Sequence, residues 1–167
     1  HPDIKQTFIS SGFVRTAGVL VKEGGAYGDL YADGWARTPS GQLIMDGAGK
    51  PLVSSTQEYL GNFNPKFTLG LNNAFSFGKI RLNVLVDARI GGVMTSGSDA
   101  SLAFDGSSAI TTAYREGGWV LPGVTLSNNE YIPNTYPINA ETFWTTVSKG
   151  RYSWGQVFTY DATNVRI

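Results

Sequence analysis

The side chains that enzymes use for nucleophilic and acid–base chemistry are sparse in this sequence. The single histidine is His1, at the first position, and the chain contains no cysteine. A Ser-His-Asp triad, a histidine metal site and a cysteine metal site therefore lack their central residues. The aspartates and glutamates are scattered, with no visible pair to serve as general acid and base. We therefore expect no catalytic residue, no metal site, no cofactor and no enzymatic activity.

Two groups of residues have the chemistry of a binding surface. Arg81, Asp87 and Arg89 occupy odd positions of one segment, so they share a face if that segment is a strand. They could line a polar channel, or they could form cross-strand charge pairs worth on the order of a few tenths of a kcal/mol.

The second group is aromatic and lies in a segment rich in turn-forming residues. It consists of Trp119, Tyr131 and Tyr136, with prolines at positions 122, 133 and 137 nearby. Exposed rings in such a region could stack on sugars, although packing within the loops also accounts for them. These six residues are the candidates for substrate binding.

The charged group belongs to two adjoining segments in which apolar and polar residues alternate. In residues 67–77 the large apolar residues fall on odd positions, whereas in residues 80–90 they fall on even positions. A period of two is typical of a strand with two different faces. The change of parity predicts a two-residue turn at Gly78-Lys79, of type II′ because glycine comes first. Phe77 then lies opposite Ile80, and the apolar residues face one side of the hairpin, except that Asn73 falls on the apolar face and Leu85 on the polar face.

The length of this hairpin bears on its surroundings. Each arm has about 11 residues, whereas strands in soluble proteins usually have about five or six. Tilted by about 45°, such a strand spans on the order of 25 Å, the height of the lipid-facing band of an outer-membrane barrel. The apolar face would meet lipid and the polar face a watery lumen. The alternative is one layer of a soluble β-sandwich, with the polar face in bulk water.

The rest of the sequence predicts a mainly β fold with one short helix and long loops, in a single segment of residues 1–167. Strands are expected at residues 18–22, 27–35, 42–45, 50–53 and 156–167, and residues 92–139 are expected to be irregular. A helix is predicted from Ala140 to about Val147, with Asn139 as its cap and Gly150 just past its end.

Composition excludes other classes of protein. The 13 basic and 13 acidic residues leave no net charge and do not cluster, so nucleic-acid binding has no support. No run approaches the roughly 18 apolar residues of a transmembrane helix. The first residues lack the apolar core of a secretion signal, so an exported protein would have lost its signal, or this sequence would be an internal piece.

Four stretches, in order, resemble the C-terminal half of SusC/RagA-type TonB-linked outer-membrane receptors. They are residues 20–31 (LVKEGGAYGDLY), 59–67 (YLGNFNPKF), 87–92 (DARIGG) and 160–167 (YDATNVRI). No single stretch is decisive, but the ordered set is specific and spans nearly the whole chain.

The resemblance implies part of a barrel of about 22 strands, of the plugged transporter class, in the outer membrane of a Gram-negative bacterium. Such receptors import glycan oligomers or peptides, are driven by the inner-membrane TonB complex, and carry a SusD-like surface lipoprotein as a lid. Gly78-Lys79 becomes a periplasmic turn, and residues 92–135 become an extracellular loop region.

The plug, the coupling segment and the other strands of such a receptor are missing from this sequence, so it resembles a fragment. If the fragment folds in isolation, its apolar row should be covered by other strands, by helix 140–147 or by another copy. The alternative to the receptor is a soluble β-sandwich that binds carbohydrate.

Overall fold

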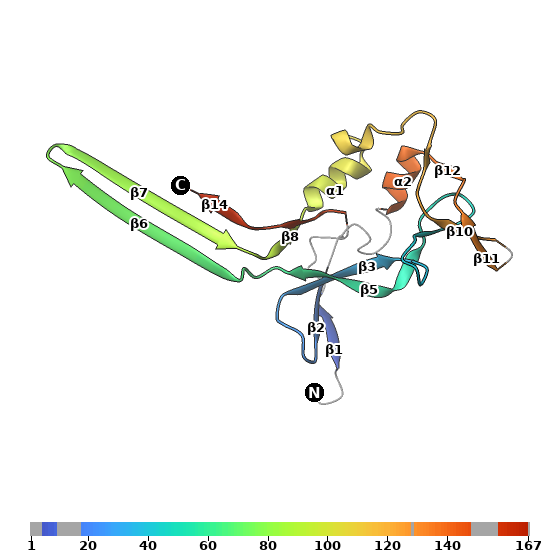
Figure 1. Ribbon diagram of the computed structural model, residues 1–167, viewed down its shortest axis with the longest axis horizontal. Coiled ribbons are helices and arrows are strands. Elements are labelled where there is room, and N and C mark those ends of the chain that lie inside the picture. Colours follow the sequence, from blue (N-terminus) through green and yellow to red (C-terminus); the bar gives the residue numbers. More distant parts are fainter. Residues whose placement is uncertain (1–4, 10–17, 128, 148–156, 167) are drawn as a thin grey trace.

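The computed structural model describes residues 5–9, 18–127, 129–147 and 157–166 (Figure 1). The strands are β1 (Gln6–Ile9), β2 (Gly18–Lys22), β3 (Asp29–Trp35), β4 (Ile44–Met45), β5 (Val53–Asn62), β6 (Phe67–Phe77), β7 (Ile80–Ile90), β8 (Val93–Thr95), β9 (Trp119–Val120), β10 (Val124–Ser127), β11 (Glu130–Pro133), β12 (Pro137–Ile138), β13 (Thr159–Asp161) and β14 (Asn164–Arg166). The helices are α1 (Gly97–Phe104), the 3₁₀ turn η1 (Ala109–Thr111) and α2 (Ala140–Val147). The prediction of a mainly β chain is confirmed.

The described residues form five separate sheets and no closed barrel. Their strand orders are β1-β2-β3-β5, β11-β10-β4, β12-β9, β13-β8 and β14-β7-β6. All these pairings are antiparallel except that of β4 with β10, which is parallel. Figure 1 shows β6 and β7 extending away from the other elements, which we call the body of the molecule. β14 lies beside the part of β7 nearest the body.

The long hairpin has the predicted register. Phe77 pairs with Ile80, Leu71 with Val86, and Phe67 with Ile90, without a bulge over 11 pairs. Gly78 has a φ of +60°, and Lys79 is not in the positive-φ region. A single positive φ at the first central residue is the type II′ geometry, whose twist suits paired strands.

The helix prediction is confirmed for α2 and incomplete for the segment before it. Residues 140–147 form α2, and the Asn139 Oδ1 accepts a hydrogen bond of 2.6 Å from the Thr142 amide. Residues 92–139 are not irregular, because they contain α1, η1 and five short strands. Ser96 caps α1 by accepting from the Asp99 amide at 3.1 Å. Gly150 lies outside the described residues.

The final strand predicted at residues 156–167 is divided in two within residues 157–166, and its two end residues lie outside the described residues. Ala162 and Thr163 separate β13 from β14, and the Thr163 amide donates to the Asp161 carboxylate in a tight bend. β13 therefore pairs with β8, whereas β14 pairs with β7. Of the strands predicted at residues 42–45 and 50–53, the structure keeps the two residues of β4, a bridge between Met45 and Pro51, and Val53 as the first residue of β5.

The hydrophobic core lies in the body of the molecule, away from the hairpin. Its buried members are Met45, Ala100, Ala103, Leu121, Ile138, Phe143 and Phe158. Ala100 and Ala103 come from α1 and Phe143 from α2, so the two helices pack on this core. Among the described helices, none is long and apolar enough to cross a membrane.

Candidate functional site

The sheet β14-β7-β6 has one polar face, made by alternate residues of its three strands. Arg81 lies opposite Ser76 near the turn, and Asp87 lies between Gly70 and Arg166 at the other end. Arg81 and Asp87 are six positions apart, which is about 20 Å along a strand. The structure therefore does not bring these two charges together. Instead it places Arg166, which sequence reasoning missed, directly beside Asp87.

The alternation of Asn164, Val165 and Arg166 was the signal for this third strand. Asn164 and Arg166 pair with Arg89 and Asp87 on the polar face, and Val165 pairs with Ala88 on the apolar face. In antiparallel neighbours the Cβ atoms lie about 4.5–5.5 Å apart, close enough for opposite charges to attract.

Arg89 has a structural role that its position on the polar face of β7 did not indicate. Its Nη2 donates to the Phe63 carbonyl at 2.7 Å, in the connection between β5 and β6. Its Nε is buried and has no hydrogen-bond partner among the described residues. The Arg89 guanidinium thus stabilises the base of the hairpin and is not exposed on the polar face of the sheet.

The opposite face of the same sheet is apolar and open. Its exposed members are Phe67, Leu69, Leu71, Phe75, Phe77, Ile80, Leu82 and Val165. Their exposed fractions run from 44% for Phe75 to 70% for Ile80. Of the three covers expected for this row, helix 140–147 does not supply one, because α2 packs on the core of the body instead. Apart from Asn73 this face is apolar, and exposed apolar surfaces are typical of sites that contact a partner or a membrane.

The first two stretches of the family resemblance meet at the base of the hairpin. The Asn62 side-chain amide donates to the Tyr27 carbonyl at 3.0 Å and to the Asp29 carboxylate at 2.9 Å. The Asn64 amide donates to the same Tyr27 carbonyl at 2.8 Å. The Phe63 backbone N–H donates to the Gly28 carbonyl at 3.0 Å. The side chains of Asn62 and Asn64, in the second stretch, therefore donate hydrogen bonds to the turn at residues 27–29, in the first stretch.

The third and fourth stretches join the same place, which we call the junction (residues 27–29, 62–64, 89–92 and 161–163). Besides the Arg89 bond to Phe63, the Gly91 amide donates to Thr163 Oγ1 at 2.9 Å. The Ala162 amide donates to the Gly92 carbonyl at 3.0 Å. Four segments far apart in sequence thus fix the direction in which the hairpin leaves the body.

Asp29 is the charged centre of the junction. It is buried, and the Asn62 amide, together with the Ala26 N–H, holds the pKa of its carboxyl below the ordinary value. On the neighbouring strand the pKa of Lys22 is raised, chiefly by the Tyr31 side chain, over whose ring the Lys22 Nζ lies 5.0 Å from the centroid. Both shifts favour the charged forms.

The three aromatic candidates are separated, not gathered into a platform. Trp119 is half-buried, stacks on Tyr114 at 4.9 Å between ring centroids, and meets the Phe143 ring edge-on at 5.1 Å. Tyr131 is exposed on β11, and Tyr136 is exposed just before β12. Trp119 therefore serves the packing of α2, and no ring contact among the described residues joins it to the two tyrosines.

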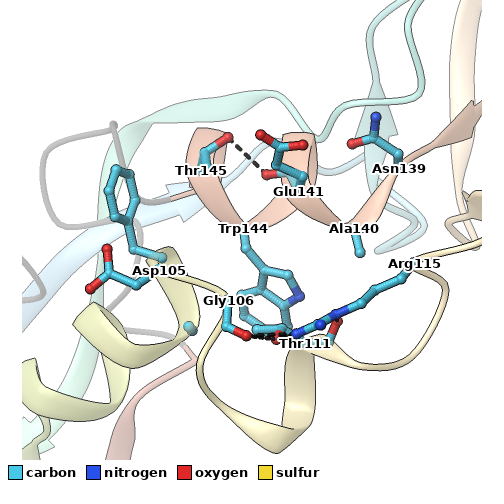
Figure 2. Close-up of a pocket in the computed structure, with 11 residues that line it drawn as sticks. Asp105, Gly106, Thr111, Arg115, Asn139, Ala140, Glu141, Trp144 and Thr145 are labelled. Atoms are coloured by element: carbon cyan, nitrogen blue, oxygen red, sulfur yellow. Dashed lines mark hydrogen bonds between the residues drawn. The ribbon is translucent and has the colours of Figure 1, made fainter.

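A pocket of about 470 Å³ lies between α2 and the segment that follows α1. Its polar lining includes Asp105, Thr111, Arg115, Asn139 and Glu141, and Trp144 supplies an aromatic wall. Figure 2 shows the Trp144 indole projecting from α2 toward Gly106 and Thr111. Sequence reasoning assigned no binding role to this pocket, because its walls come from segments about thirty residues apart.

Within the described residues, no group of three or more histidine, aspartate or glutamate side chains is placed to hold a metal ion. No protein-family model matches the sequence, and no curated protein matches it. The two-faced sheet, the junction and the pocket are therefore the features of the molecule that bear on its function.

Proposed function

We propose that this chain is part of the barrel wall of an outer-membrane TonB-dependent transporter, which imports glycan oligomers or peptides. The supporting observation is the sheet β14-β7-β6, whose apolar side exposes Phe67, Leu69, Leu71, Phe75, Phe77, Ile80, Leu82 and Val165 while its other side carries Arg81, Asp87 and Arg166. In such a barrel the apolar side faces lipid and the charged side faces the watery lumen.

The third strand strengthens this assignment. β14 continues the alternation of the hairpin, with Val165 on the apolar face and its two polar neighbours on the other. A barrel wall grows by adding antiparallel strands of the same pattern. Among the described residues, no strand pairs with the outer edge of β6 or with residues 80–86 on the outer edge of β7, so further strands of the parent protein could add there.

The arrangement of the body suits the mouth of a transporter. The turn at Gly78-Lys79 lies at one end of the long hairpin, and α1, α2 and β9–β12 lie beyond the other end (Figure 1). With the turn on the periplasmic side, these elements stand on the cell surface. There they would meet the imported nutrient and a SusD-like lipoprotein, while the inner-membrane TonB complex would act through the parent protein.

The alternative, a soluble carbohydrate-binding β-sandwich, has less support. Such a fold would bury the apolar face of the hairpin against a second sheet. It would also need a free ring at Trp119, and that ring is stacked on Tyr114.

Cysteine labelling of the full-length protein in cells tests the proposal. The 167-residue segment contains no cysteine. Leu71→Cys and Asn72→Cys therefore each give this segment one thiol at a known position. A membrane-impermeant maleimide should label Asn72→Cys once the cells are permeabilised and should label Leu71→Cys only after the membrane is dissolved. Equal labelling of the two thiols, or recovery of the protein without detergent, would refute the barrel wall.

A further inference from the structure

The pocket beside α2 contains a guanidinium group that is held in place before any ligand arrives. The Arg115 Nη2 donates to the Gly106 carbonyl at 2.6 Å and to Thr111 Oγ1 at 2.8 Å, and its Nε donates to the Thr111 carbonyl at 2.9 Å. Thr111 is itself 2% exposed and donates to the Ser108 carbonyl at 2.7 Å. These bonds fix the plane of the guanidinium fork, so binding would cost little side-chain entropy.

The outer nitrogen of this fork remains available. None of the hydrogen bonds of Arg115 to described residues uses Nη1, which carries two donor hydrogens. Arg115 lines the pocket, so a ligand oxygen in the cavity can accept from it.

Trp144 gives the pocket an aromatic wall. The Phe143 ring meets the indole edge-on at 5.0 Å, and the Phe158 ring is tilted against it at 6.2 Å. Neither neighbour is stacked flat on the indole, which is half-buried and lines the cavity. A flat, partly open ring is a surface on which the C–H side of another ring can pack.

The remaining lining is rich in hydrogen-bond acceptors. Asp105 and Glu141 contribute two exposed carboxylates, against the one positive charge of Arg115. Two carboxylates beside one cation disfavour an acidic ligand and accept hydrogen bonds from neutral hydroxyl groups. The volume of about 470 Å³ lies within the range of about 300–1,000 Å³ that is usual for small-molecule sites.

We infer that this pocket binds one neutral sugar unit of an oligosaccharide, with the ring packed on Trp144 and its hydroxyls shared between Arg115 and Glu141. The binding follows from the pocket alone. Its use, which is capture of a glycan at the outer mouth before import, rests on the function proposed above and favours glycans over peptides as its substrate.

Binding can be measured on the 167-residue chain in detergent micelles. The probes are maltotriose, mannotriose and cellotriose, with trialanine as the peptide arm, followed by saturation-transfer NMR and tryptophan fluorescence. At least one trisaccharide should bind saturably and trialanine should not. Trp144→Ala should weaken that binding at least about tenfold, which corresponds to about 1.4 kcal/mol.

Two further variants separate loss of the site from loss of the fold. Glu141→Gln changes an exposed side chain and should weaken sugar binding several-fold while leaving the circular dichroism spectrum unchanged. Leu126→Ala shortens an exposed side chain outside the pocket and should leave the affinity unchanged.

Three results would overturn the inference: binding of trialanine in preference to the sugars, absence of saturable binding by every trisaccharide, or sugar binding that neither Trp144→Ala nor Glu141→Gln weakens. None of these results depends on the membrane, so they are independent of the cysteine labelling. Sugar binding together with equal labelling of Leu71→Cys and Asn72→Cys would keep the pocket and reject the barrel wall.

Discussion

Leu71 and Asn72 are neighbours on β6 that face opposite sides of the sheet, so replacing each by arginine gives a matched pair of variants. Leu71 is the fifth of the 11 residues of β6, close to the middle of the strand. If the apolar face meets lipid, Leu71→Arg places a guanidinium near the bilayer midplane, whereas Asn72→Arg places one in the lumen.

The cost of Leu71→Arg depends on the medium. A lipid-facing arginine at the midplane of an outer-membrane barrel costs about 2–4 kcal/mol. That corresponds to a folding equilibrium constant lowered about 30- to 700-fold. In water the same change should cost no more than about 0.5 kcal/mol, because Leu71 is already 50% exposed. Asn72→Arg should stay within about 0.5 kcal/mol in either medium.

The assay is equilibrium unfolding of the full-length protein in phospholipid vesicles, with guanidinium as denaturant and tryptophan fluorescence as the signal. Phe77→Arg, beside the turn, adds a control for depth and should cost only about 0–1 kcal/mol, because interfacial positions tolerate charge. Equal destabilisation by Leu71→Arg and Asn72→Arg, or a larger cost at Phe77 than at Leu71, would refute a lipid-facing row.

The junction gives two further predictions, both measured by denaturation of the 167-residue chain in micelles. Gly28→Ala should cost about 1–3 kcal/mol, because φ is +97° and the new Cβ would lie 2.5 Å from Asn64 Nδ2. Gly24→Ala, with φ of +74° and open space around it, should cost less, and an equal cost would contradict the packing argument. Folding lowers the pKa of the Asp29 carboxyl, so the ionised carboxylate stabilises the fold when the pH is above 3.8, the ordinary pKa of aspartate. This stabilisation is lost as the pH falls below that pKa. Asp29→Asn should therefore be less stable at pH 6 and show a shallower loss between pH 4 and pH 2, and parallel pH profiles would contradict this role.

The hairpin could be predicted residue by residue because its information is local. Alternation of apolar and polar residues fixes the faces, and the parity change at Gly78-Lys79 fixes the register. The α2 helix was predictable for the same reason, since Asn139 caps it from the adjacent position. The α1 helix also had a local signal in the Ser96–Asp99 cap, but its glycine and serines are weak helix formers.

The candidate site was harder to predict because it depends on contacts between distant segments. The parallel pairing of Ile44 with Val124 leaves no trace in the periodicity of either segment. The sequence placed Arg89 among the residues that could line a channel, whereas in the structure its side chain donates to the Phe63 carbonyl. The pocket follows from the packing of α2 against the segment after α1, which no spacing rule anticipates.

The hairpin and the body differ in when they can form during synthesis. β6 and β7 adjoin in sequence, and a hairpin closes in about 1–10 μs once both strands have left the ribosome. The body must wait for Val124 to reach β4 and for Thr159 to reach β8. At about 5–20 residues per second, that interval lasts several seconds. The apolar face of the hairpin is thus formed well before β14 and the body are complete, and during that interval it is a surface open to aggregation.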